Sequence, residues 1–224
     1  MILMNLFSIF EPSSFLNIPL MWIILILPMI FIPTTFWFKF SPANQLTYTI
    51  FYQLNSEFNQ IMTSFKHKGT TLIFSIMFLM ILTYNFIGLF PYIFTSTAHL
   101  VVTLSLALPF WLTFMFFGWV KNTNLMFSHL VPIGTPQALS PFMVCIETIS
   151  NIIRPITLSV RLAANMIAGH LILSLMSMVF SPILMKTYFV LPMISPILIL
   201  ESAVAIIQAF VFSMLVTLYS TEIH

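Results

Sequence analysis

Apolar residues fill most of the chain in blocks that are long enough to cross a membrane. Residues 20–38, 70–90 and 99–120 each provide about the 20 apolar residues that a membrane-spanning helix needs. Pro28 and Pro33 are expected to kink the first of these helices. The pattern therefore predicts three upright spans in the first part of the chain.

Residues 43–65 follow a different pattern, in which apolar side chains recur at every third or fourth position. The apolar positions are Leu46, Ile50, Leu54, Phe58, Ile61 and Phe65, and the polar residues between them include Gln45, Gln53, Asn55, Glu57 and Asn59. This spacing is typical of an amphipathic helix that lies on the membrane surface. The segment Lys66-His67-Lys68-Gly69 is expected to end it.

The C-terminal part of the chain predicts a long helical hairpin. Residues 141–180 contain no loop signal other than Pro155. As one helix they would be about 60 Å long, against a hydrocarbon core of about 30 Å, so this arm must tilt strongly. Residues 182–195 are interpreted as the connecting turn and 196–220 as the second arm. The polar residues 121–140 are expected to form a loop.

Lysines predict the orientation in the membrane. The segment between the first two spans carries three lysines and one glutamate, whereas the link after the second span has no charge before His99. The positive-inside rule then places residues 39–69 on the cytoplasmic or matrix side. We therefore expect the N-terminus outside and the C-terminus inside, although Lys186 falls on the outer side.

Composition supports a single membrane domain, residues 1–224, of the all-α class. Hydrophobic residues make up 60% of the chain, charged residues only 5%, and no residue is Asp. Soluble domains carry roughly 25% charged residues, so a soluble enzyme, a nucleic-acid binder and a disordered regulator are excluded. The lone Cys145 excludes a disulfide framework and a Cys-rich metal site. We expect no cofactor, and insertion by the spans themselves.

Charged residues in the first arm of the hairpin are the first candidates for function. A charge at mid-membrane costs about 3 kcal/mol on insertion scales. Glu147, Arg154 and Arg161 are seven residues apart and nearly eclipse one another at about 100° per residue. Asn165 joins this polar face, with Asn151, Thr157, Ala164 and Ala168. Glu147 and Arg154 could also be an ion pair that only joins helices, and Arg154 could snorkel.

The second arm and the opposite face of the first arm add further polar groups. Glu201 and Gln208 fall on one line of the second arm, and His170 lies half a turn out of phase with Arg161. His170 and Glu201 can both carry a proton and would face each other across the hairpin. Asn165 and Gln208 could also be packing amides. Small residues such as Ala164, Ala168 and Gly169 leave room for a partner.

Four stretches of the sequence resemble subunit a of F-type ATP synthases. They are Ser159-Val-Arg-Leu-Ala-Ala-Asn-Met-Ile-Ala-Gly-His170, Asn85-Phe-Ile-Gly-Leu-Phe-Pro-Tyr92, Glu147-Thr-Ile-Ser-Asn-Ile-Ile-Arg-Pro155 and Glu201-Ser-Ala-Val-Ala-Ile-Ile-Gln208. The resemblance covers nearly the whole chain. It is to the mitochondrially encoded form of an insect or related invertebrate.

This resemblance implies a proton-translocating, non-catalytic subunit of the mitochondrial inner membrane. Its hairpin would press against a rotating ring of small carboxylate-bearing subunits, beside the peripheral stalk, other membrane-sector subunits and lipid. An outer half-channel would deliver protons through His170 and Glu201, and an inner one near Glu147 would release them to the matrix. Arg161 would separate the two and favour the ionised ring carboxylate. Asn165 and Gln208 would form hydrogen bonds near the arginine site.

Two other functions are known for membrane proteins built from several apolar helices, and each predicts sequence features of its own. A secondary transporter with its own substrate site usually shows internal repeats and paired broken helices, and the sequence shows neither. A haem- or copper-binding respiratory subunit needs axial ligands inside the spans, and only His170 lies deep in the apolar sequence.

Overall fold

The computed structural model describes residues 10–12, 20–26, 41–62, 69–90, 93–131, 136, 139–180 and 187–222. All regular elements within these residues are helices, in the order η4 (Leu20–Leu25), α2 (Pro42–Ile61), α3 (Thr70–Gly88), η5 (Ser96–Ala98), α4 (Leu100–Lys121), α5 (Thr123–His129), α6 (Ser140–Phe180) and α7 (Thr187–Glu222). Four of the described helices, α3, α4, α6 and α7, are long and apolar enough to cross a membrane. The all-α membrane fold is therefore confirmed.

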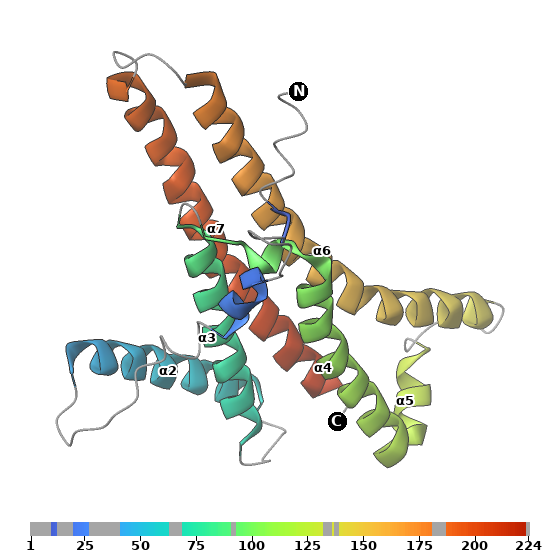
Figure 1. Cartoon of the computed structure of the whole chain (residues 1–224). Helices are drawn as coiled ribbons and strands as arrows, with labels where there is room; N and C mark the ends of the chain where they lie inside the picture. The colour runs from blue at the N-terminus through green and yellow to red at the C-terminus, as the bar shows by residue number, and fades with distance from the viewer. Residues whose placement is uncertain are drawn as a thin grey trace.

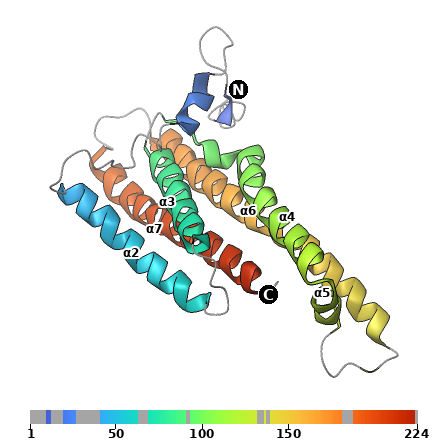
Figure 2. The same cartoon turned by 90° about the horizontal axis from the view of Figure 1, so that it is seen from below.

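Helix α2 has a side-chain cap at its N-terminus, and only its C-terminal half packs against other helices. The side chain of Ser41 accepts a hydrogen bond from the backbone N–H of Asn44, and Pro42 occupies the first turn, where a missing N–H costs nothing. Leu54 and Phe58 are buried, whereas Leu46 in the first half is exposed. The amphipathic pattern is thus used for packing only near the C-terminal end, where α2 lies beside α3 and α7 (Figure 2).

The long helices form two layers, with α3 and α4 in one layer and the hairpin of α6 and α7 in the other. Helix α3 packs against α7, helix α4 packs against α6, and α6 and α7 pair as the arms of a hairpin (Figures 1 and 2). Phe58, Ile81 and Ala209 lie fully buried at the centre of the core. The Tyr84 hydroxyl donates to the Leu25 carbonyl and so ties α3 to η4. Apolar side chains also cover much of the exposed surface, as a lipid environment requires.

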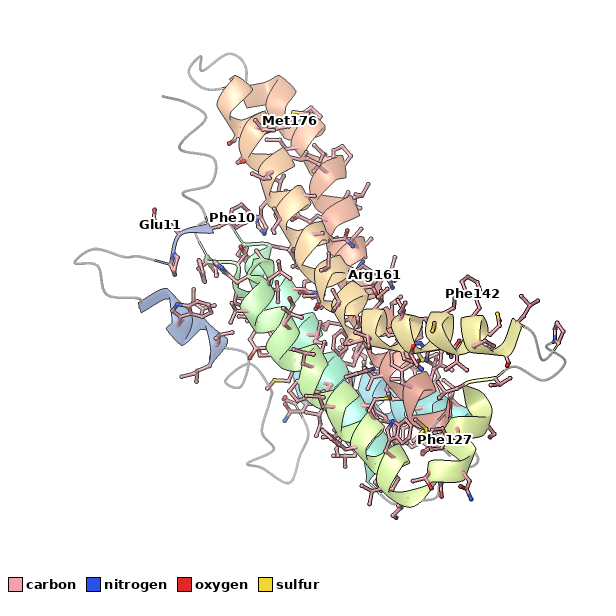
Figure 3. The ribbon with its side chains drawn as sticks, turned by 90° about the vertical axis from the view of Figure 1, so that its right-hand side faces the viewer. Phe10, Glu11, Phe127, Phe142, Arg161 and Met176 are labelled. Atoms are coloured by element: carbon pink, nitrogen blue, oxygen red, sulfur yellow. The ribbon has the colours of Figure 1, made fainter. Side chains whose placement is uncertain are left out.

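Helix α6 is continuous but bent. It contains 41 residues, with Pro155 inside it. At about 1.5 Å per residue it is roughly twice as long as a bilayer core is thick, so it cannot stand upright. Figure 3 shows the two halves of the bent helix α6, one marked by Phe142 and the other by Met176, with Arg161 close to the bend. Proline removes one backbone hydrogen bond and clashes with the carbonyl four residues earlier, which explains the bend.

Two sequence expectations about loops are wrong. Helix α7 begins at Thr187, so most of the predicted turn 182–195 is helical and Pro192 and Pro196 lie inside the helix. Pro196 leaves the Pro192 carbonyl without its helical donor, and this carbonyl accepts a hydrogen bond from the Ser195 hydroxyl at 3.3 Å. The predicted loop 121–140 contains α5, in which Phe127 packs edge-on against Trp119 with ring centroids 5.0 Å apart.

Part of the predicted topology cannot be compared with the structure. Of the predicted first span, residues 20–38, only 20–26 are described, and they form η4 and the turn after it. The lysines on which the predicted orientation depends, at positions 39, 66 and 68, lie outside the described residues. The orientation and the surface position of α2 therefore stay predictions.

Candidate functional site

Arg161 lies on the exposed face of α6, close to its bend (Figure 3). Thr157, Ala164 and Ala168, each one or two helical turns away, are exposed on the same face. No carboxylate among the described residues lies within ion-pair distance of the guanidinium. A cation on an apolar helix is costly in lipid, so this face fits a partner that brings a carboxylate close to Arg161.

The amides predicted near Arg161 lie beside it on both arms of the hairpin. Gln208 of α7 and Arg161 line the same small cavity, together with Leu158, Leu162, Val211 and Phe212. Asn165 follows Arg161 by one turn of α6, and both amide side chains are half-buried. Each arm therefore places one amide near the arginine at one level of the hairpin, while the guanidinium stays on the exposed face.

His170 and Glu201 meet between the arms of the hairpin. The distance from His170 Nε2 to Glu201 Oε1 is 3.8 Å, and the side chains are only 13% and 5% exposed. The imidazole also approaches the backbone of Gly88 at the end of α3. Both carboxylate oxygens of Glu201 and Nε2 of His170 have no hydrogen-bond partner among the described residues. A buried polar group left in this condition costs about 1–3 kcal/mol, so the pair is suited to binding water or a proton.

Gly169 provides the space for the Glu201 carboxylate. A Cβ atom added at this glycine would overlap with Glu201 Oε1 and would lie 2.7 Å from Cδ and 3.1 Å from Cγ. No ordinary side chain fits there without moving the carboxylate. The glycine that precedes His170 in the sequence is therefore a positioning residue for its partner on α7.

Glu147 and Arg154 form a second pair towards the N-terminal end of α6. Arg154 Nη2 lies 3.7 Å from Glu147 Oε1, and the side chains are 28% and 34% exposed. The guanidinium also stacks over the ring of Tyr219 on α7, with its carbon 5.1 Å from the ring centroid. All three residues line a cavity of about 450 Å³ between α4, α5, α6 and the end of α7, which includes Asn151, Trp111 and Trp119. The alternative interpretation of this pair as an ion pair thus has a geometric basis.

The structure groups the predicted residues at three levels of the hairpin. His170 pairs with Glu201, Arg161 lies beside Gln208, and Glu147 pairs with Arg154. His170 is nine residues beyond Arg161, which is about 13 Å along the helix axis. The described residues hold no group of three or more His, Cys, Asp or Glu side chains that could bind a metal ion.

Sequence reasoning missed polar residues outside the hairpin. Asn85 of α3 is 1% exposed, and its side-chain nitrogen donates to the carbonyl of Ala205 on α7 at 3.3 Å. The available signal was an amide inside an apolar span, at the start of a motif already quoted for the family resemblance. His99 is a second such residue: its Nε2 is buried and its ring contacts the rings of both Trp22 and Phe94. Local sequence gives no sign of such contacts because Trp22 lies 77 residues away.

Comparison with known proteins identifies the family. Residues 18–221 match the family described as ATP synthase A chain. ATP synthase subunit a of Drosophila melanogaster is 52% identical over 225 residues, covering 98% of this chain and 99% of the relative. The subunits a of Locusta migratoria and Anopheles gambiae are 53% and 50% identical, with the same coverage of both chains. With four span-length helices among the described residues, these similarities indicate a multi-pass protein of the mitochondrial inner membrane. The chain therefore belongs to the ATP synthase subunit a family, whose members are non-catalytic subunits of the membrane sector.

Proposed function

We propose that this chain forms two offset proton half-channels and presents Arg161 between them to a rotating ring of carboxylate-bearing subunits. Membership of the family supports the role of a proton-channel subunit that assembles with the ring and with other subunits. The peripheral stalk and lipid are further partners in this proposal. The observation that carries it is an exposed arginine on a long apolar helix, with small residues on the same face.

The face around Arg161 supports contact with a ring. Thr157, Ala164 and Ala168 allow another helix to approach closely, and the guanidinium would then meet a carboxylate in a low-dielectric contact. Guanidinium keeps its proton even when it loses water, so it favours the ionised carboxylate as it passes and blocks direct proton transfer across the site. Asn165 and Gln208 would orient the arginine by hydrogen bonds.

The His170–Glu201 pair supports a role in proton entry. Imidazole and carboxylate both bind and release protons, and here they are 3.8 Å apart in a buried site. A relay through this pair would deliver protons to the ring from the intermembrane space. The entry site lies about 13 Å along α6 from Arg161. In this proposal the fixed positive charge of the guanidinium blocks a direct route, so the proton transfers to the ring first.

The cavity beside Glu147 supports a role in proton release. It is about 450 Å³ in volume and is lined by Glu147, Asn151 and Arg154 on α6. Glu147 is half-exposed, so water can reach its carboxylate. In this proposal the cavity opens to the matrix, with the C-terminus of the chain on that side and the N-terminus in the intermembrane space.

Exchange of Arg161 tests the proposal. Arg161→Lys should abolish ATP-driven pumping, because a desolvated ammonium loses its proton and the barrier between the half-channels then fails. Arg161→Ala should also abolish pumping and should permit a passive proton leak. The measurements are pumping and leak in vesicles that contain the mutant complex, after the ring and this chain have both been detected in it.

Arg154→Lys is the matched control for this exchange. It makes the same change in the same helix, two turns away, at a side chain that already has a carboxylate partner. Its loss of pumping should be clearly smaller than that of Arg161→Lys, because an ammonium group can keep the ion pair with Glu147, and this pair is about one-third exposed. Coupled pumping in both Arg161 variants would contradict the proposal.

A further inference from the structure

The link between α3 and α4 holds buried hydroxyl groups without a hydrogen-bond partner. Thr95 and Thr97 are 2% and 1% exposed, and neither Oγ1 atom has a partner among the described residues. Nε2 of His99, at the end of the link, is in the same condition. Buried polar atoms are nearly always bonded to protein or to ordered water.

Five buried hydroxyls inside the long helices behave differently. They donate to the carbonyl three residues earlier in their own helix, as seen for Ser75, Thr103, Ser159, Ser213 and Thr217. Thr95 has extended backbone angles, and Thr97 lies in the three-residue η5, so no preceding helical turn offers them a carbonyl. Their hydroxyl groups are therefore available to a group other than their own backbone.

The link lies beside the His170–Glu201 pair. The element η5 packs against α6 (Figure 1). Ala98 of η5 packs with Met166 and Ala205. Met166 is one helical turn before His170 on α6, and Ala205 is one turn after Glu201 on α7. The link thus contacts both arms of the hairpin within one turn of the buried pair.

Gly88 connects the link to the imidazole more directly. The Thr95 methyl carbon lies 3.4 Å from the position that a Cβ atom of Gly88 would occupy. His170 approaches the backbone of the same glycine. His99 is held by ring contacts, with centroids 5.5 Å from that of Trp22 and 5.1 Å from that of Phe94. Buried polar atoms without a partner among the described residues thus lie on both sides of this contact, in the link at Thr95, Thr97 and His99 and in the hairpin at His170 and Glu201.

We propose that Thr95, Thr97 and His99 line the outer stretch of the proton-entry path and hold the water molecules that lead to His170 and Glu201. The inference rests on the proposed entry role of that pair. Each threonine acts as a positioning residue, because its hydroxyl donates to or accepts from water. Each water accepts one proton, which forms an O–H bond, and releases another to the next acceptor, which breaks one, so the threonine itself is unchanged. Water that bridges two polar groups is nearly as favourable as a direct hydrogen bond.

Valine and serine exchanges test the role of the hydroxyls. Thr95→Val and Thr97→Val keep the side-chain shape but remove the hydroxyl, and should lower proton flux through the reconstituted complex roughly threefold or more, since ordered water is lost. Thr95→Ser and Thr97→Ser should restore the flux. Thr103→Val is the matched control: Thr103 is as deeply buried, but its hydroxyl already donates to the Leu100 carbonyl, so flux should stay near wild type.

Silver ions test for water at the same positions. Cys145 is the only cysteine in the sequence and is exposed, so Cys145→Ser removes every thiol of this chain and is also the Ag⁺ control for thiols elsewhere in the complex. In this background, Ag⁺ added on the side of the α3–α4 link should block proton flux in Thr95→Cys and Thr97→Cys. Thr103→Cys should remain insensitive.

The outcomes separate this inference from the function on which it rests. If Glu201→Gln slows proton flux but both valine variants and both cysteine variants behave like their Thr103 controls, the water path through the link is wrong and the entry role of the pair stands. If Glu201→Gln itself has normal flux, the entry role fails as well. Where a valine variant does not assemble, the response of the corresponding cysteine variant to Ag⁺ decides.

Discussion

Two ionisable pairs lie on opposite sides of Arg161 along the hairpin. The distance between the paired nitrogen and oxygen atoms is nearly the same in both, but the exposure of their side chains differs. His170 and Glu201 are 3.8 Å apart, belong to different helices and are largely buried. Glu147 and Arg154 are 3.7 Å apart, belong to the same helix and are about one-third exposed. Distance alone therefore does not distinguish them.

The two pairs differ in how many of their side chains can exchange a proton and in the groups that surround them. Both members of the buried pair can exchange protons, whereas Arg154 cannot, and its guanidinium is also stacked on Tyr219. The oxygens of Glu201 have no described partner, while Glu147 faces a cavity. We infer that proton transfer through His170 and Glu201 requires their exact positions. At Glu147, water in the cavity can carry much of the proton transfer instead.

The largest effect should follow from removing the acid of the buried pair. Glu201→Gln keeps the volume but cannot carry a proton, so flux should fall about 100-fold, as is common for a lost proton-transfer group. The measurement is passive proton flux in vesicles with the assembled membrane sector. Near-normal flux would remove Glu201 from the path and would make the two pairs alike.

A smaller effect is expected from displacing the carboxylate without removing it. In Gly169→Ala the new methyl group would push the Glu201 carboxylate away from His170, and flux should fall about tenfold, because small misplacements of a reacting group are costly. Combining it with Glu201→Asp gives a double-mutant cycle, since the shorter acid leaves room for the methyl group. Simple additivity of the two losses would contradict the positioning role of Gly169.

The smallest effect should be found at the half-exposed pair. Glu147→Gln should lower flux less than about threefold, because water in the neighbouring cavity can bridge the path. The comparison is made with Glu201→Gln in the same preparation and with equal amounts of assembled complex. A loss of proton flux as large as that of Glu201→Gln would show that the difference in burial does not make the two pairs functionally different.

The sequence by itself predicted much of this fold. Helical periodicity and apolar block length are local properties, and they indicated a helix at 43–65 against the observed Pro42–Ile61, and one at 141–180 against Ser140–Phe180. Four motifs identified the family, which the comparisons confirm. The spacing of charges also pointed to Arg161, because a charge in apolar sequence is conspicuous without any structure.

Only the tertiary structure decided the surroundings of those residues. Pro192 and Pro196 lie inside α7, where the Ser195 hydroxyl donates to the Pro192 carbonyl that Pro196 leaves without its helical donor. That Gly169 faces Glu201, and that Thr95 lies against Gly88, depends on contacts between segments far apart in the chain. Threonines in an apolar sequence resemble ordinary helix residues, and their hydroxyls become significant only where the fold buries them without a carbonyl to bond.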